Sequence, residues 1–354
     1  MIDVKIVTEN EFSDFLKLPS MLYEKKRCVQ KISEEEALLK GTHTLSGYFS
    51  FTGFVCFKDG ALSARCAVTL YPEKDFAYIG FFECTDDEDV AISLIKSAEE
   101  FAKEKGRTKL IGPVDASFWI SYRMKADRFD KLPYLSEPYC KEYYPRLWEK
   151  CGFAVSERYI SNIYEKFSSD EKNIKKYINR YNAFLKKGYK IISPKKSQWD
   201  KVIKEVYALI IKLYSDFPVF SYITEEEFCT LFSSFKLILD FSMVKVAYFN
   251  GEAVGFFIGA PDYKNRLYNK IGFAELLFLL KNRTKCDNYI MLYVGVDDKH
   301  KGLGTAMTQA VFDNMRKKKA TAIGAFIKEG KVTARYVGEK ISGQYHYLLF
   351  EKEI

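Results

Sequence analysis

Two glycines separated by one residue lie in a basic loop in the last third of the sequence, Lys299-His-Lys-Gly302-Leu-Gly304-Thr305. An apolar run (residues 289–296) precedes this loop, and helical spacing follows it over residues 305–319. A strand that leads through such a turn into a helix collects free backbone N–H groups at the helix N-terminus, where glycine permits close approach. The pattern predicts an anion site suited to a pyrophosphate.

Other interpretations of this loop remain open on the motif alone. Gly-x-Gly also occurs in ordinary strand-to-helix turns. The sequence contains no Gly-x-x-x-x-Gly-Lys-Ser/Thr, and Met307 stands where Gly-x-Gly-x-x-Gly requires its last glycine. The two common nucleotide-binding motifs are therefore excluded.

The composition is typical of a globular protein and selects few partners. The chain has 354 residues, 47% of them hydrophobic and 29% charged, and its net charge is +8, too little to indicate a nucleic-acid partner. Eight cysteines without a Cys-x-x-Cys pair, and three histidines, argue against a metal site and favour reduced thiols in a cytoplasmic protein. No run approaches the ~18 apolar residues of a membrane span, so no membrane partner is expected.

Turn and cap signals divide the chain into two halves, residues 1–167 and 168–354. Ser168, Ser169 and Asp170 are plausible N-cap residues of a basic helix over 171–187. Further helices are predicted over 200–214, from Thr224, and over 274–281, 305–319 and 332–341. Strands are predicted over 243–249, 253–259, 289–296, 321–327 and 345–350, the first two joined by the hairpin turn Asn250-Gly251.

The first half repeats this order in weaker form. It has a predicted hairpin (53–57 and 64–71), a strand (76–83), a helix (90–105), a strand (109–111) and a helix (143–150). A meander followed by strands that alternate with helices predicts, in each half, a mixed α/β (α+β-like) fold with a twisted sheet flanked by helices.

The basic loop resembles the pyrophosphate loop of the GNAT superfamily of acyl-CoA-dependent N-acyltransferases, Gln/Arg-x-x-Gly-x-Gly/Ala, with Lys299 in place of the usual Arg or Gln. Tyr144-Pro-Arg-Leu-Trp-Glu-Lys-Cys-Gly-Phe153 is similar to the helix ending of that family. The whole chain also resembles a bacterial group of two-lobed (tandem) GNAT proteins, on stretches such as Ile111-Gly-Pro113 and Ile223-Thr-Glu-Glu-Glu-Phe228. The resemblance implies two tandem GNAT-like lobes.

The same resemblance implies a site for acetyl-CoA or another acyl-CoA in the second lobe. Backbone N–H groups on the strand would polarise the thioester carbonyl, and those of the loop would hold the pyrophosphate. The implied cofactor-binding residues are Val294, Val296, Lys299, His300, Lys301, Gly302, Leu303, Gly304 and Thr305. The first lobe has Cys84-Thr-Asp-Asp-Glu-Asp89 at the corresponding place, where four carboxylates would repel a pyrophosphate and suit the first turn of a helix. We expect one acyl-CoA site.

The catalytic acid and base are less well determined. Tyr336 and Tyr345 are candidates for the acid, with Tyr347 a further one, and Glu275 is the candidate for the base beside Asp262, Asp297 and Glu83. Each of these tyrosines and carboxylates could instead be a packed, helix-capping or surface residue without a catalytic role. The predicted function is transfer of a short acyl group, such as acetyl, from CoA to an amine of a small molecule or peptide, by a monomer or homodimer. A non-catalytic acyl-CoA sensor or scaffold is the alternative, and an aminoacyl-tRNA-dependent transferase is a second one.

Overall fold

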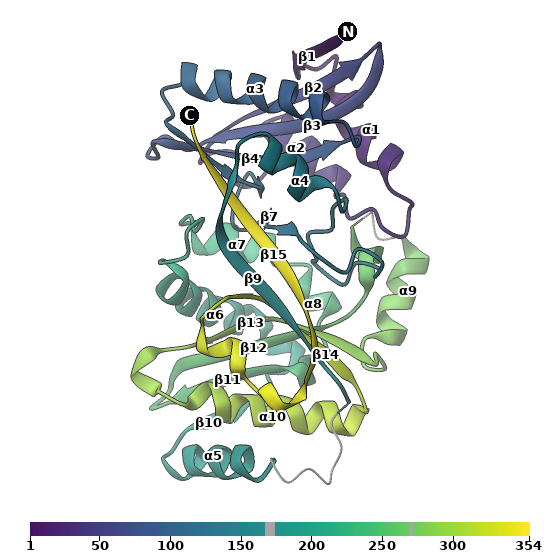
Figure 1. Ribbon diagram of the computed structural model, residues 1–354. Coiled ribbons are helices and arrows are strands. Elements are labelled where there is room, and N and C mark those ends of the chain that lie inside the picture. Colours follow the sequence, from purple (N-terminus) through teal and green to yellow (C-terminus); the bar gives the residue numbers. More distant parts are fainter. Residues whose placement is uncertain (167–173, 269–271) are drawn as a thin grey trace. The chain divides into compact units, whose positions relative to one another are not determined.

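The computed structural model describes residues 1–166, 174–268 and 272–354, and contacts divide the chain into two compact units. The first unit comprises Met1–Tyr159, Lys264–Lys270 and His346–Ile354, and the second comprises Ile160–Tyr263 and Ile271–Tyr345. The chain passes from one unit to the other within two long strands, β9 (Ala154–Tyr164) and β15 (Ile341–Glu353) (Figure 1). The boundary expected near residue 167 and the caps Ser168, Ser169 and Asp170 lie outside the described residues, so the division at 167/168 stays a prediction.

The first unit contains a mixed sheet in the order β1-β2-β3-β4-β5, in which only β4 and β5 are parallel. The end of β15 pairs antiparallel with β5. Helix α3 covers this sheet because its apolar positions, among them Val90, Leu94 and Ala98, recur on one face and are buried. The elements are β1 (Ile2–Ile6), α1 (Phe12–Leu22), α2 (Ile32–Leu39), β2 (Ser50–Lys58), β3 (Ala61–Leu70), β4 (Phe76–Cys84), α3 (Glu88–Glu104), β5 (Lys109–Gly112), β6 (Val114–Asp115), β7 (Ser121–Tyr122), β8 (Met124–Lys125), α4 (Tyr144–Lys150) and the short helix η3 (Lys264–Leu267).

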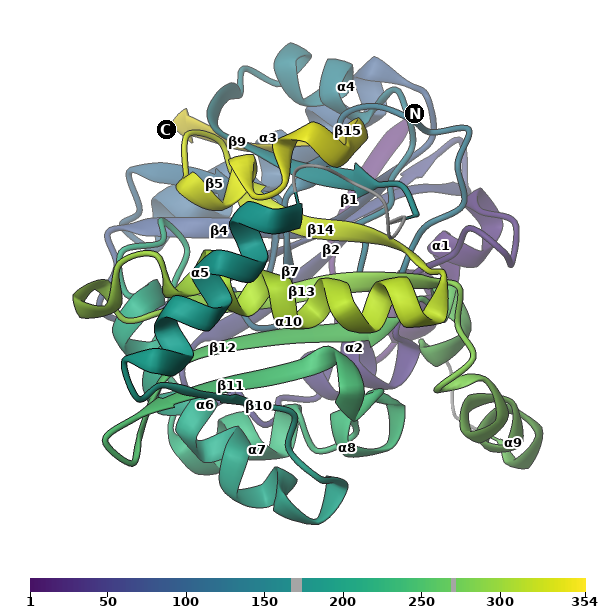
Figure 2. The same ribbon diagram turned by 90° about the horizontal axis from the view of Figure 1, so that it is seen from below.

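The second unit repeats this arrangement. In the strand order β14-β13-β12-β11-β10, β13 and β14 pair in parallel and the other neighbours pair antiparallel. Helix α10 runs along this sheet with α5 beside it (Figure 2). The elements are α5 (Ile174–Lys186), β10 (Lys190–Ile192), η1 (Lys196–Gln198), α6 (Trp199–Tyr214), α7 (Glu225–Leu231), α8 (Phe235–Ile238), η2 (Phe241–Met243), β11 (Val244–Phe249), β12 (Glu252–Pro261), α9 (Phe273–Asn282), β13 (Asn288–Val296), η4 (Asp298–His300), α10 (Leu303–Lys318), β14 (Thr321–Lys328), η5 (Val332–Arg335) and η6 (Gly338–Lys340).

Local signals in the sequence account for several of these elements. Asn250 and Gly251 both have positive φ angles, 51° and 88°, as the two-residue hairpin between β11 and β12 requires. Thr224 caps α7 through a reciprocal pair of hydrogen bonds, in which its hydroxyl accepts from the Glu227 N–H and the Glu227 carboxylate accepts from the Thr224 N–H. The mixed α/β class predicted for the chain is confirmed.

The helix predicted over residues 332–341 is wrong. The structure has two single 3₁₀ turns there, η5 and η6, and Val337 between them adopts a left-handed conformation with φ of 50°. A residue in that conformation interrupts the i to i−4 hydrogen-bond ladder, so the periodic apolar positions of this stretch do not join one α-helix. The segment contributes Tyr336 to the site described next.

No helix in the described ranges has both the length and the apolar composition needed to cross a bilayer.

Candidate functional site

Strands β13 and β14 part at their carboxyl ends. They pair in parallel only from Asn288 to Met291 on β13, whereas β13 continues along β12 as far as Val296. The register with β12 shifts between Ile258 and Gly259, which makes Leu292 the extra residue of a β-bulge. Beyond Met291 the edge of β13 is therefore no longer paired with β14. The carboxyl ends of strands are where α/β sheets bind ligands.

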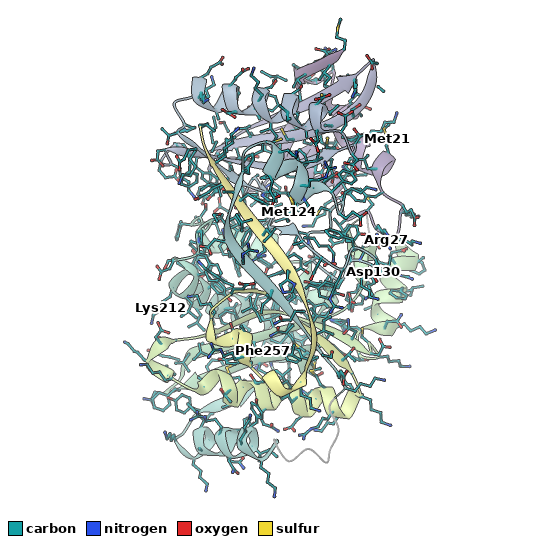
Figure 3. The ribbon with its side chains drawn as sticks, viewed as in Figure 1. Met21, Arg27, Met124, Asp130, Lys212 and Phe257 are labelled. Atoms are coloured by element: carbon teal, nitrogen blue, oxygen red, sulfur yellow. The ribbon has the colours of Figure 1, made fainter. Side chains whose placement is uncertain are left out.

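The turn that follows β13 is held by Asp297. Its carboxylate accepts from the Lys299 N–H at 3.2 Å and from Lys212 Nζ at 2.6 Å, and its carbonyl accepts from the His300 N–H. The hydrogen bond from Lys212, which Figure 3 labels on α6, lowers the pKa of Asp297. Thus the N–H groups of Lys299 and His300 shape the turn and are already bonded.

The next residues form the N-terminus of α10. Gly302 is the N-cap, and its φ of 86° lies in the left-handed region that favours glycine. Leu303, Gly304 and Thr305 occupy the first helical positions, whose N–H groups have no acceptor within the helix. The anion site stays a prediction, and Lys301, the residue before Gly302, is exposed.

Tyr336 lies against this helix N-terminus. A β-carbon placed on Gly304 would meet the Tyr336 hydroxyl at less than 3.0 Å, closer than real Cβ contacts allow. The Tyr336 carbonyl accepts from the Tyr164 hydroxyl at 2.9 Å, which anchors the segment, and burial raises the pKa of the Tyr336 phenol. A protonated hydroxyl thus stands beside the loop amides.

Sequence reasoning missed Arg180. This residue lies on α5, which packs on α10 through Tyr177 and Phe312 with ring centroids 6.0 Å apart. Its guanidinium carbon lies 3.3 Å from the position of a β-carbon on Gly302. The basic character of residues 171–187 was the available signal, but only the packing of α5 on α10 brings one cation to the loop.

His300 faces the protein on one side. Its Nδ1 atom shares a hydrogen bond of 2.7 Å with the Tyr189 hydroxyl, and Tyr189 stacks on Phe249 with centroids 4.4 Å apart. The imidazole therefore has a defined orientation at the outer side of the turn.

The remaining predicted residues are spread over three elements. Val294 and Val296 pair with Phe257 and Gly255 of β12, and the Val294 carbonyl also accepts from the Tyr214 hydroxyl at 3.0 Å. Tyr345 is buried on β15, and Glu275 is half-buried in the first turn of α9. Of the three predicted catalytic residues, the structure thus brings Tyr336 to the loop of α10.

A narrow apolar pocket adjoins β13 on the side of α6. Its free space is about that of one water molecule. Tyr293 lies in its wall next to the bulge, and its ring contacts Phe232 at a centroid distance of 6.0 Å. The other lining residues are Trp199, Ile203, Val206, Ile210, Phe228, Phe235 and Ile258.

In the first unit, Val114 and Asp115 lie against the corresponding strand, β4. Strand β4 pairs with β5 only up to Tyr78 and has its own register shift near Phe81. The backbone of Val114 lies against Gly80, and the Asp115 carboxylate accepts from the Phe81 N–H at 2.6 Å. Asp87 caps α3 by accepting from the Val90 N–H, as expected for the acidic stretch. The Asp115 carboxylate thus already accepts the backbone N–H at the irregular part of β4.

Among the residues that the structure describes, no group of three or more His, Cys, Asp or Glu side chains could hold a metal ion.

No family model matches the chain. The chain is 21% identical over 376 residues to protein YghO of Escherichia coli (strain K12), covering 98% of this chain and 94% of that protein. It is 25% identical over 213 residues to a bacterial ceramide synthase of Caulobacter vibrioides (strain NA1000 / CB15N), covering 58% of this chain and 54% of that protein.

Among solved structures, the chain is similar to a tandem GNAT protein from the clavulanic acid biosynthesis pathway, with a TM-score of 0.53, 11% identity, and coverage of 100% of this chain and 98% of that one. The chain therefore has the two-lobed fold of a tandem GNAT protein.

Proposed function

We propose that the chain is an acyl-CoA-dependent N-acyltransferase whose acyl-CoA site lies in the second unit. The observation that carries this proposal is the α10 N-terminus, with Gly302 in a left-handed conformation, at the end of a strand that parts from its parallel neighbour. The N–H groups of residues 302–305 and the positive end of the helix dipole suit a pyrophosphate. Lys301 and Arg180 add positive charge at the same place.

In this proposal the parted edge of β13 orients the thioester. The N–H groups around the Leu292 bulge polarise the carbonyl, and a neutral amine attacks the carbonyl carbon. The C–N bond forms, the C–S bond breaks, and the proton that the amine nitrogen loses is balanced by the proton that the departing thiolate takes up to leave as the thiol. Because its phenol stays protonated, Tyr336 can donate a hydrogen bond to a phosphate oxygen. Proton transfer through Tyr336, Tyr345 or Glu275 is part of the proposal, and mutation of each tests it.

The proposed reaction has two versions, which differ in the acyl chain and in the amine that accepts it. The first is the transfer of a short acyl group, such as acetyl, to an amine of a small molecule or peptide. The second is acylation of a long-chain amine, supported by the relative named as a bacterial ceramide synthase. A ceramide is an amide of a fatty acid with a long-chain amino alcohol, so its synthesis is N-acylation. The proposal also includes a cytoplasmic monomer or homodimer without a metal or nucleic-acid partner.

The binding step is tested by thermal-shift titration with acetyl-CoA and octanoyl-CoA. A ligand at 100 times its dissociation constant stabilises a protein by about 2.7 kcal/mol. Gly302→Glu should abolish the shift. Gly330→Glu is the matched control, because Gly330 has nearly the same φ, 83° against 86°, and its β-carbon would meet open space. Equal shifts in both variants would refute the site.

Turnover is tested by release of free thiol with a panel of short, peptidic and long-chain amines. Thiol release that depends on an amine supports the enzyme, and the preferred amine separates the two versions. Binding without release would favour a sensor. No binding of either thioester would leave the aminoacyl-tRNA-dependent alternative. Transfer from aminoacyl-tRNA releases a tRNA hydroxyl and no thiol, so it is tested by loss of a labelled aminoacyl group from the tRNA in the presence of the amine panel.

A further inference from the structure

Helix α9 presents an apolar stripe to solvent. Phe273, Leu277 and Leu280 follow one another at intervals of four and three residues, so they share a helical face. Their exposed fractions are 77%, 50% and 48%. The helix is held by Leu279, which points the other way and is buried. Three large apolar side chains on one exposed face indicate an interaction surface.

Positive charge lies near the carboxyl end of the stripe. Lys281 is exposed in the last turn of α9, and Lys285 is exposed three residues after the helix ends, with half-buried Arg283 between them. The carboxylates nearby in the sequence are Glu275 in the first turn and exposed Asp287. An amphipathic helix with Phe and Leu on one face and basic residues beside it is typical of helices that lie in the interface of an anionic bilayer. A docking surface for another folded protein would not require this charge.

The position of α9 suits such contact. In both views of the ribbon, α9 lies at the outer edge of the second unit, away from α10 and α5 (Figures 1 and 2). It packs on α8, where Leu237 is 42% exposed. Phe235 of the same short helix lines the apolar pocket beside Tyr293. Helix α8 therefore both contacts α9 and lines the pocket.

We propose that the α9 surface, defined as Phe273, Leu277, Leu280, Lys281 and Lys285, binds the surface of an anionic lipid bilayer, with the helix lying in the interface. The apolar side chains enter the boundary between headgroups and acyl chains, and the two lysines contact anionic headgroups. The sequence expectation of no membrane partner came from the lack of a spanning run, which does not bear on a helix that lies in the interface. The proposal holds whether or not the chain transfers acyl groups.

The test is co-sedimentation of the full chain with sucrose-loaded vesicles, either of phosphatidylcholine alone or with 30 mol% phosphatidylglycerol. The parent should bind the anionic vesicles, and binding should weaken as salt is raised. Phe273→Ser/Leu277→Ser should lower the partition constant about tenfold or more. Lys281→Gln/Lys285→Gln should lower it for anionic vesicles and leave binding to neutral vesicles unchanged.

Ile92→Ser/Leu132→Ser is the matched control, because both residues are apolar and 42% exposed in the first unit. This control should bind as the parent does, and thermal melting checks that each variant is folded. The proposal is overturned if the parent does not bind anionic vesicles or if the α9 variants bind equally well. It is also overturned if the parent is a dimer by sedimentation velocity and Phe273→Ser/Leu277→Ser makes it a monomer without changing vesicle binding.

Discussion

The hydroxyl of Tyr336 occupies the space that a side chain at position 304 would need. Tyr336 belongs to the segment that follows β14, whereas Gly304 lies in the first turn of α10. This contact between the two gives position 304 a reason to be glycine that does not depend on a ligand. Gly304 has a second role in the helix, because its carbonyl accepts from the Thr308 hydroxyl at 2.8 Å. The conformation of the glycine loop is thus fixed by contacts within the protein.

The first prediction concerns this pair. Gly304→Ala should lower the free energy of unfolding by about 1–3 kcal/mol, because the new methyl group meets the Tyr336 hydroxyl. In a Tyr336→Phe background the same change should cost less, since the nearest atom has been removed. Urea unfolding of the four proteins gives the coupling energy, expected at about 0.5–2 kcal/mol. Equal costs in both backgrounds would contradict the contact.

The second prediction concerns Arg180. Arg180→Ala should weaken acetyl-CoA binding about fivefold, because it removes an exposed cation beside the loop, and the difference should shrink as salt is raised. Isothermal titration calorimetry at two salt concentrations measures both effects. Lys186→Ala is the control, since it removes an exposed cation six residues further along the same helix. If both variants lose the same affinity for acetyl-CoA, the effect comes from the net charge of the protein and not from the position of Arg180.

The third prediction concerns the pH dependence of stability. The Glu83 carboxylate in the first unit accepts from the hydroxyls of Tyr23 and Tyr144, at 2.8 and 2.7 Å. Burial raises the pKa of Glu83 from 4.5 to about 7, although Arg65 and these hydroxyls act in the opposite direction. Between pH 4.5 and 7 the folded chain therefore binds more protons than the unfolded chain, and the free energy of unfolding falls as pH rises.

The contribution of Glu83 across that window is about 3 kcal/mol. Glu83→Gln should remove it, so the difference between parent and variant should change between pH 4.5 and 7 and be constant above pH 7.5. Urea unfolding at half-unit intervals measures this difference, and exposed Glu252→Gln serves as the control. A difference that does not change with pH would show that Glu83 is ionised throughout the window.

The fourth prediction concerns the cap of α7. Thr224→Ala removes the hydroxyl that accepts from the Glu227 N–H and should lower the free energy of unfolding by about 1 kcal/mol. Thr230→Ala, inside the same helix, should cost less because alanine favours helix. Chemical denaturation followed by circular dichroism compares the two. A larger loss for Thr230→Ala would contradict the capping role.

The sequence by itself determined the features that depend on neighbouring residues. The Asn250-Gly251 turn, the Thr224 cap and the left-handed Gly302 follow from the conformations that individual residues prefer, and such preferences act over a few residues. Periodicity likewise predicted α6 and α10, because their apolar positions repeat along one face.

Tertiary structure decided what lies together. The local pattern over 332–341 suggested a helix, but Val337 is left-handed and Tyr336 is directed to Gly304. Arg180 comes to Gly302 from another helix, and the last residues of β15 complete the sheet of the first unit. These contacts join residues far apart in the sequence, and their energy comes from packing and burial that only the folded chain provides, so no local pattern could reveal them.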